Sequence, residues 1–455
     1  MPQNEKKIFK QKFKFLDKYL DLYKKDYLSE FKLAKDFVFE RLNRRKECTF
    51  DYPPYVYYKE AIDKDRNPDN LFDLWPDKTP FVMCFYFPFC TNKCSYCTFT
   101  NLKKNIVSEF SDYLKYYKKE LLMYKDLIKR NKISHIYIGG GTPTLMTEEQ
   151  LEDLLKFIKK HFLPYLLKPL DEIEFTCEAS PPTLTDKKIK ILKKYGVNTI
   201  TLGVQTLDPK VLKTIGRYQT KEQVINVLPK IIKLFKVNVD IIAGLPASNL
   251  QIFAQDLNTI VKLKPQHLGV YLLTLYDHSK LGQSDYYVPR KDYLQYYDLA
   301  YKTLSKQGYI HSTFEEYSLD HKYRLMYLED FLENNLHLTT GLGDSGFTGT
   351  HWYNNTDDMG KYKNYIKNGL LPIDKKYKMT IADLQVKFII YGLRKLNLNK
   401  KEYLKMFNEP IEKRYSLEIN ALTDLGFLKH EGNKIDLTYE GKRDFELIMQ
   451  FFMRL

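Results

Sequence analysis

The 455-residue chain lacks several features that mark common protein classes. No stretch approaches the roughly 18 continuous apolar residues that a membrane-spanning helix needs, so no membrane span is predicted. The first twenty residues alternate lysine with aromatic residues and contain no continuous apolar block. We therefore expect no secretory signal and a cytoplasmic location. Internal repeats and low-complexity linkers are also absent, while 44% apolar residues exclude a disordered chain and leave room for two to three domains.

Acidic residues are fewer than basic ones: 57 Asp and Glu stand against 72 Lys and Arg, for a net charge of +15. Such an excess can indicate a nucleic-acid or membrane-surface partner. Here the basic residues are dispersed and no nucleic-acid-binding module is recognisable, so we expect no nucleic-acid partner. An AT-rich genome, which favours lysine and tyrosine codons together, explains the excess more simply.

From residue 81 onward, short apolar runs alternate with longer amphipathic stretches. Six such repeats predict parallel strands with helices outside, as in a partial (β/α)6 TIM-like barrel of the α/β class. We expect an N-terminal helical extension over residues 1–75, the barrel region over 76–375, and a small helical, winged-helix-like domain over 376–455. Residues 279–375 have an irregular pattern. The expected strands are residues 81–87, 133–138, 173–177, 198–203, 237–242 and 267–273, and the clearest helices are 109–129, 148–161, 186–195 and 250–263.

Cysteine is scarce, yet three of the six cysteines fall within eight residues. Cys90, Cys94 and Cys97 follow the first expected strand with the spacing Cys-x3-Cys-x2-Cys, which arises by chance with a probability of roughly 0.001 at this cysteine frequency. Three thiolates on one loop suit an iron–sulfur cluster or zinc. Structural zinc needs a fourth ligand at regular spacing, and the next histidine is His135. A four-iron cluster is therefore favoured, because three ligands leave one iron open to a substrate or cofactor.

Other candidate residues stand where the expected strands end. The motif Gly139-Gly140-Gly141-Thr142-Pro143 would let backbone groups approach a ligand without interference from a Cβ atom, although it is neither a dinucleotide fingerprint nor a phosphate loop. Barrel enzymes place their chemistry at the carboxyl ends of the strands. Taken singly, each further candidate is an ordinary polar residue at a strand end or a surface arginine. Together they would bind an amino group, ribose hydroxyls and a carboxylate: Glu178, Gln205, Asp240 and Arg217.

Taken in order, these motifs resemble the radical S-adenosylmethionine (SAM) enzymes, and within them the oxygen-independent coproporphyrinogen III oxidase (HemN-like) family. That family includes heme chaperones and the anaerobic heme-degrading methyltransferases ChuW, HutW and HmuW. The resemblance covers about residues 50–450. It implies a [4Fe-4S] cluster on Cys90, Cys94 and Cys97, two SAM molecules, a heme or porphyrin substrate, and a reducing electron donor such as flavodoxin or ferredoxin. The implied chemistry is reductive cleavage of SAM to a 5′-deoxyadenosyl radical.

The resemblance also implies roles for single residues. Gly140 and Glu178 would hold the cluster-bound SAM, and Gln205, Arg217 and Asp240 a second SAM or an equivalent ligand. The remaining cofactor positions are matched by alignment to the family. These are Tyr96, Gly141 and Thr142 near both ligands, Thr274, Phe347, and Cys84, which replaces a family tyrosine and reads by itself as a buried strand thiol.

Departures from the family pattern bear on the reaction. Phe99 stands where the decarboxylating oxidases have a fourth cysteine, and Tyr323-Arg-Leu-Met-Tyr-Leu replaces the His-Asn-x-x-Tyr-Trp stretch of the chaperones. With the long N-terminal segment, these departures favour heme methylation and ring opening. The alternatives are a heme chaperone, an oxidative decarboxylase, and a methyltransferase acting on another planar aromatic. Candidate heme contacts are His351 and His311, with His321 and His337, although each alone is more often a core or surface histidine.

Overall fold

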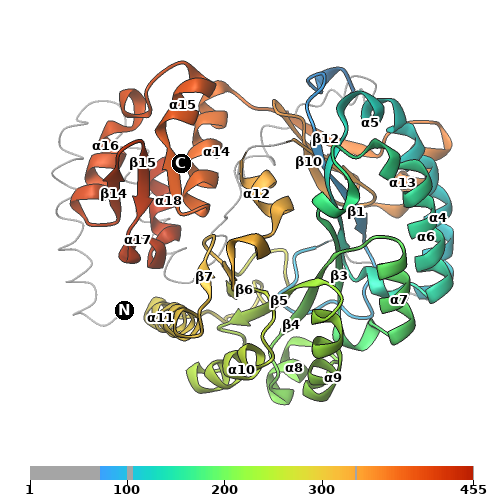
Figure 1. Cartoon of the computed structure of the whole chain (residues 1–455), viewed down its shortest axis with the longest axis horizontal. Coiled ribbons are helices and arrows are strands. Elements are labelled where there is room, and N and C mark those ends of the chain that lie inside the picture. The colour runs from blue at the N-terminus through green and yellow to red at the C-terminus, as the bar shows by residue number, and fades with distance from the viewer. Residues whose placement is uncertain (1–71, 100–105, 334–335, 454–455) are drawn as a thin grey trace.

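The computed structural model describes residues 72–99, 106–333 and 336–453 of the chain. Its centre is a twelve-stranded sheet in the order β12-β11-β10-β9-β1-β2-β3-β4-β5-β6-β8-β7. Strands β1 to β6 run parallel to one another, and helices line the outside of the curved sheet (Figure 1). These strands are β1 (Phe81–Phe87), β2 (Ile133–Gly140), β3 (Phe175–Ala179), β4 (Thr199–Gln205), β5 (Lys236–Ala243) and β6 (His267–Leu272).

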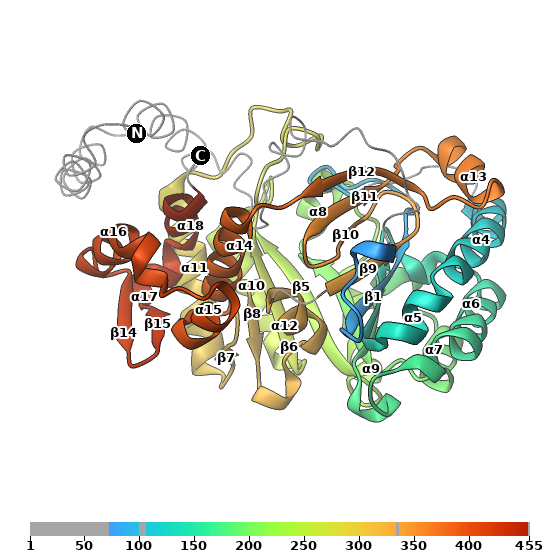
Figure 2. The ribbon, with the colours of Figure 1, turned by 90° about the horizontal axis from the view of Figure 1, so that it is seen from above.

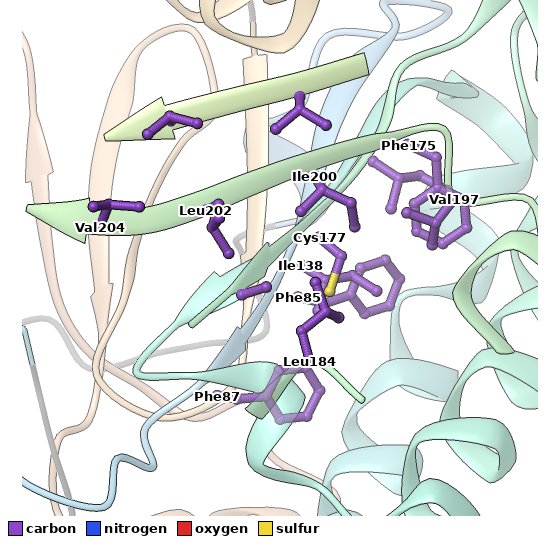
Figure 3. Packing of buried hydrophobic residues seen from close by; sticks show 14 of the residues in the cluster. Phe85, Phe87, Ile138, Phe175, Cys177, Leu184, Val197, Ile200, Leu202 and Val204 are labelled. Atoms are coloured by element: carbon purple, nitrogen blue, oxygen red, sulfur yellow. The ribbon is translucent and has the colours of Figure 1, made fainter. Parts of the chain in front are cut away.

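The helices expected between the strands are present, so the prediction of a partial (β/α)6 barrel is confirmed. Side chains of β1 to β4 pack outward against them (Figure 3). Capping residues set where several helices begin: α6 starts after Thr147, whose hydroxyl and backbone exchange hydrogen bonds with Gln150. The helices are α4 (Ile106–Met123), α5 (Lys125–Asn131), α6 (Glu148–His161), α7 (Asp186–Lys194), α8 (Pro209–Ile215), α9 (Lys221–Ile232) and α10 (Leu250–Lys262).

The barrel does not close, because other strands extend the sheet beyond both β1 and β6. On one side β9 (Leu336–Thr340) pairs in parallel with β1 and leads into an antiparallel set; on the other, β8 (Glu316–Ser318) pairs antiparallel with β6. The expectation that residues 279–375 are irregular is therefore wrong. The region also contains α11 (Arg290–Lys306), β7 (Ile310–His311), α12 (Met326–Leu332), β10 (Ser345–Phe347), β11 (His351–Asn355), α13 (Met359–Lys367) and β12 (Ile373–Lys378).

The C-terminal part forms a second body of helices with a three-stranded sheet, shown in orange and red beside the barrel (Figures 1 and 2). These elements are consistent with the expected helical, winged-helix-like domain. A second hydrophobic cluster fills this part and includes Phe347 and Trp352 from the barrel extension. The elements are α14 (Ile381–Arg394), β13 (Asn397–Asn399), α15 (Lys400–Phe407), α16 (Ile411–Asp424), β14 (Leu428–Glu431), β15 (Lys434–Leu437), α17 (Tyr439–Arg443) and α18 (Phe445–Met453).

The expected N-terminal helical extension lies almost wholly outside the described residues, and the domain limits at 75 and 375 stay predictions. Among the helices that the structure describes, none is both long and apolar enough to cross a membrane.

Candidate functional site

The three clustered cysteines lie on a loop that follows β1, residues 88–99, which we call the cysteine loop. It stands at the carboxyl ends of β1–β6; we call these ends, with the loops that follow them, the barrel mouth. Backbone hydrogen bonds tie the loop to two neighbouring segments: Ser95 N–H donates to Ile215 O at 3.0 Å, and Leu281 N–H donates to Ser95 O at 2.7 Å. The cysteine loop is therefore fixed by the segments that follow α8 and β6.

The glycine motif after β2 supports the same loop from a third side. Gly141 N–H donates to Phe87 O at 2.7 Å, and Thr142 N–H donates to Phe89 O at 2.8 Å. A Cβ atom on Gly141 would lie 2.3 Å from Phe89 O, and one on Gly140, whose φ is +109°, would lie 2.7 Å from Phe87 O. The close approach that these glycines permit is thus to the backbone of β1 and the cysteine loop.

Each thiol has a distinct setting on the half-buried loop. Cys90 Sγ lies 3.4 Å from Thr142 Oγ1, and Cys94 Sγ lies 4.0 Å from Arg217 Nη1. Burial raises the pKa of the Cys90 thiol to about 11, and burial also raises the pKa of Cys97. Without a bound cation these two thiols are protonated at neutral pH, so loading a metal centre releases protons.

The donor set fits an iron–sulfur cluster better than a single metal ion. In the parts of the chain that the structure describes, no three His, Cys, Asp or Glu side chains converge closely enough to ligate one ion. A four-iron cluster takes one thiolate on each of three different irons, so its cysteines need not converge. Three half-buried thiols on one braced loop meet that requirement.

Glu178 projects from β3 toward the glycine motif. Its Oε2 accepts a hydrogen bond from Gly140 N–H at 3.1 Å, and its Oε1 accepts one from the Tyr137 hydroxyl. Burial raises the pKa of this carboxyl to about 7, although both hydrogen bonds lower it. A carboxylate held against a glycine turn at the barrel mouth suits a cationic amino group.

Asp240 and Gln205 lie on the neighbouring strands β5 and β4. Asp240 Oδ1 accepts a hydrogen bond from the Asn238 side-chain amide at 2.8 Å. Burial, followed by the charge of Glu178, raises the pKa of Asp240 to about 7. The pairing of β4 with β5 slips between Gly203 and Gln205, and Gln205 adopts a left-handed φ of +67°. This bulge changes the direction of the chain at the end of β4.

Arg217 follows Gly216, the left-handed C-cap of α8. Its guanidinium donates hydrogen bonds to groups within the protein. Its Nη2 donates to Gly203 O at 2.5 Å, its Nε donates to Gln219 Oε1 at 3.1 Å, and its Nη1 donates to the Tyr96 hydroxyl at 3.4 Å. The guanidinium thus joins the end of β4 to the cysteine loop and places a positive charge beside Cys94.

Sequence reasoning missed one acidic residue of this site. The motif Gly341-Leu-Gly-Asp-Ser turns from β9 to β10 and carries Asp344, whose pKa burial raises to about 7. Its charge raises the pKa values of Cys84 and Tyr86 on β1, which places it on the inner face of the sheet. The position of this acid near Glu178 depends on the pairing of β9 with β1, which the sequence of the motif does not reveal.

Three of the expected cofactor residues lie away from the cysteine loop or at the edge of the barrel mouth. Phe347 is buried beside His337, Trp352 and the ammonium of Lys387, in the cluster shared with the C-terminal part. Cys84 pairs with Thr339 inside the sheet as a strand thiol, and burial raises its pKa.

Thr274 is half-buried just beyond the end of β6, so it stands at the edge of the barrel mouth.

The histidines proposed as heme contacts lie at the opposite end of the sheet. His337 pairs with Val82 near the start of β1. On its other side His337 pairs with Phe347 of β10, which in turn pairs with Trp352 of β11. His351 precedes Trp352 on β11 and therefore lies at the same end of the sheet. His311 is stacked on Tyr317, and its Nε2 lies 3.1 Å from Phe314 O. His321 follows β8, whose Ser318 pairs with the first residue of β6. The structure therefore does not bring these residues to the cysteine loop.

Several known proteins are similar to this chain in sequence. Residues 85–260 match the radical SAM superfamily. The heme chaperone HemW of Bacillus subtilis is 27% identical over 371 residues, which are 78% of this chain and 95% of that protein. An oxygen-independent coproporphyrinogen III oxidase of Helicobacter pylori is 26% identical over 398 residues, or 81% of this chain and 83% of the oxidase.

The fold has a counterpart among solved structures as well. Coproporphyrinogen III oxidase (HemN) from Escherichia coli, described as a radical SAM enzyme, superposes with a TM-score of 0.76 at 17% sequence identity, covering 89% of this chain and 96% of the enzyme. A radical SAM domain implies a [4Fe-4S] cluster and SAM, which agrees with the three thiols at the barrel mouth. Residues 85–260 of this chain are thus similar to the radical SAM superfamily, and most of its length is similar to HemW heme chaperones and to coproporphyrinogen III oxidases.

Proposed function

We propose that this chain is a heme-binding radical SAM protein of the heme chaperone type. One observation carries the proposal: the chain aligns with two HemW heme chaperones, from Bacillus subtilis and Lactococcus lactis, over 95% and 94% of their lengths. The cluster ligands and the acidic residues at the barrel mouth support a working radical SAM site within that framework.

Cys90, Cys94 and Cys97 would hold the cluster, which when bound supplies an electron at low potential. The remaining residues bind and orient. Glu178 would accept hydrogen bonds from the amino group of SAM, next to the backbone of Gly140. SAM carries positive charge on its sulfonium and ammonium groups, which the negative charge of nearby carboxylates would favour. Three buried carboxyls influence one another electrostatically in this region: Glu178, Asp240 and Asp344.

A second SAM on Gln205, Asp240 and Arg217 is also part of the proposal. Arg217 would contribute mainly by positioning, because its donors already bond to Gly203, Gln219 and Tyr96. We further propose a cytoplasmic location and a reducing donor such as ferredoxin or flavodoxin, because an exposed iron–sulfur cluster requires a reducing compartment.

The expected ring opening stays a prediction, and it competes with the chaperone and with oxidative decarboxylation. The relatives of known function favour the chaperone over ring opening, and the Helicobacter pylori oxidase keeps decarboxylation as the second candidate. Phe99, in the position of a fourth cysteine, weighs against the oxidase.

One anaerobic experiment separates the three. Cluster-loaded protein is mixed with SAM, a chemical reductant and either heme or coproporphyrinogen III, and pigments and gases are followed. Heme retained without turnover supports the chaperone. Loss of the Soret band with a gain of one carbon supports ring opening, and carbon dioxide from coproporphyrinogen supports the oxidase. C94A is the control and should lose both the cluster and any SAM-dependent reaction.

A further inference from the structure

The segment between β6 and α11, residues 273–289, packs against the cysteine loop; we call it the β6–α11 segment. Leu281 N–H donates to Ser95 O at 2.7 Å, and the Tyr286 hydroxyl donates to Gly244 O at 2.8 Å. Inside the segment, Ser279 N–H donates to Tyr276 O at 2.8 Å. In Figure 2 this yellow segment rises above the carboxyl ends of the strands before it descends into α11.

His278 belongs to this segment and is exposed to solvent, and its ring centroid lies 5.7 Å from that of Tyr276. Lys93 of the cysteine loop is close enough for its charge to act on the imidazole: burial, and after it Lys93, lowers the pKa of His278. A neutral imidazole is the form that ligates a metal. The side chain therefore combines exposure with a position between the two loops of the barrel mouth.

The other eight histidines, all in described residues, are excluded by their positions. His135 and His337 pair with Val82 near the start of β1, and His267 is the first residue of β6, so all three lie at the amino ends of the strands. His311, His321 and His351 belong to strands or turns paired with that same end. His161 ends α6, and His430 is on the wing of the C-terminal part.

The cysteine loop beside His278 carries exposed aromatic and basic side chains that suit the shape and charge of heme. The two most exposed large aromatic side chains among the described residues, Tyr218 and Phe99, are 68% and 56% exposed. Phe99 ends the cysteine loop, and the Tyr218 hydroxyl accepts a hydrogen bond from Asn92 of that loop. Exposed aromatic rings favour a planar apolar ligand. Lys93 of the cysteine loop and Lys280 of residues 273–289 supply positive charge that would favour the carboxylate groups of heme.

We propose that His278 is an axial ligand of heme iron bound on the exposed face of the barrel mouth, beside the cysteine loop and residues 273–289. This inference rests on the heme binding proposed above. Histidine is a common axial ligand of heme iron. In this chain it would replace the histidine of the chaperone stretch, whose place is taken by Tyr323-Arg-Leu-Met-Tyr-Leu.

The test is an anaerobic titration of the cluster-loaded full chain with hemin, followed by Soret absorbance and resonance Raman scattering. We expect H278A to lose the spectrum of imidazole-ligated iron and to bind hemin at least tenfold more weakly. Added free imidazole should restore the ligated spectrum. H321A, an exposed histidine at the opposite end of the sheet, is the matched control and should behave as the wild type. Equal iron and sulfide contents show that each variant is folded and loaded.

The outcomes are distinct. Hemin binding with an unchanged spectrum and affinity in H278A would overturn the assignment of His278 and leave heme binding standing. Absence of hemin binding by the wild-type chain would overturn the proposed function, and the inference with it.

Discussion

At the scale of single residues, Gly141 packs closely against the backbone of the cysteine loop. A methyl group at this position would meet the Phe89 carbonyl oxygen at 2.3 Å, and a rigid backbone cannot yield as a flexible side chain would. We expect G141A to displace the loop and lower the cluster content at least severalfold, measured as iron and sulfide per chain. G360A is the control, because its Cβ would meet only the Asp358 carboxylate at 3.1 Å. Full cluster content in G141A would contradict the packing described.

Glu178 and Asp240 give a prediction about pH. Each has a pKa of about 7, so each carboxyl gains negative charge as the pH rises through 7. Cation binding strengthens with that charge, and we expect SAM affinity to increase severalfold from pH 6.0 to 7.5. Equilibrium dialysis with labelled SAM measures it. E178Q should bind SAM more weakly and with a shallower pH dependence, whereas an equally steep profile in E178Q would remove Glu178 from the site.

The sequence predicted the location of a site residue where that residue stands at a recognisable position relative to an expected strand. The cysteines, the glycine motif and Glu178 could be placed because each directly follows or ends a strand that the apolar pattern marks, and Asp240 because it lies within such a strand. The histidines could not, because which end of the sheet they occupy depends on how the short strands β7 to β11 pair, and that pairing is set by distant segments.

At the scale of elements, one buried ion pair holds α12 under the barrel. Glu174, which precedes β3, pairs with Lys236 at the start of β5, and its Oε2 accepts a hydrogen bond from Met326 N–H at 2.8 Å. The Lys236 ammonium also donates to Arg324 O at 2.8 Å. The two side chains are only 1% and 15% exposed, so removal of the ammonium would leave a buried, unpaired carboxylate.

We therefore expect K236M to lower the free energy of unfolding by about 3–5 kcal/mol, as measured by urea denaturation. The matched control is K230M, which removes an exposed ion pair with Asp186 and should cost less than about 1 kcal/mol. Similar losses in the two variants would show that the pair under α12 is not effectively buried.

The helices and strands could be predicted where strands and helices alternate regularly along the chain. Parallel strands separated by helices produce long, regular apolar patterns, and all six strands of the barrel were recognised. The strands β7 to β12 are two to six residues long and rich in polar and aromatic side chains, so their sequence pattern resembles that of loops. Their pairing depends on edges that the barrel presents only after it has formed.

At the scale of the whole molecule, buried carboxyls make stability depend on pH. Four of them have pKa values of about 7: Glu120, Glu178, Asp240 and Asp344. Their folded-state pKa values lie above those of the unfolded chain, so the folded state binds protons more tightly. The stabilisation is complete below the unfolded values near 4 and is lost as the pH rises through 7, by about 1 kcal/mol per group between pH 6 and 8.

The ligand-free protein should accordingly have a higher thermal midpoint at pH 6 than at pH 8, measured by calorimetry. Glu120 provides the variant, since it lies on α4, is not among the proposed cluster or SAM ligands, and accepts hydrogen bonds from Gly341 N–H at 2.9 and 3.1 Å. E120Q cannot ionise, and it should reduce the pH dependence. A midpoint that rises from pH 6 to pH 8 would contradict the assignment of these carboxyls.

Among the residues that the structure describes, β12 is one of the two edge strands of the open sheet. An edge strand exposes unpaired backbone groups on which a strand from another molecule can assemble. In β12, three of the six residues are lysines: Lys375, Lys376 and Lys378. Two such edges brought together would juxtapose these like charges, which opposes aggregation. Part of the net charge of +15 thus keeps open sheets from adding to one another.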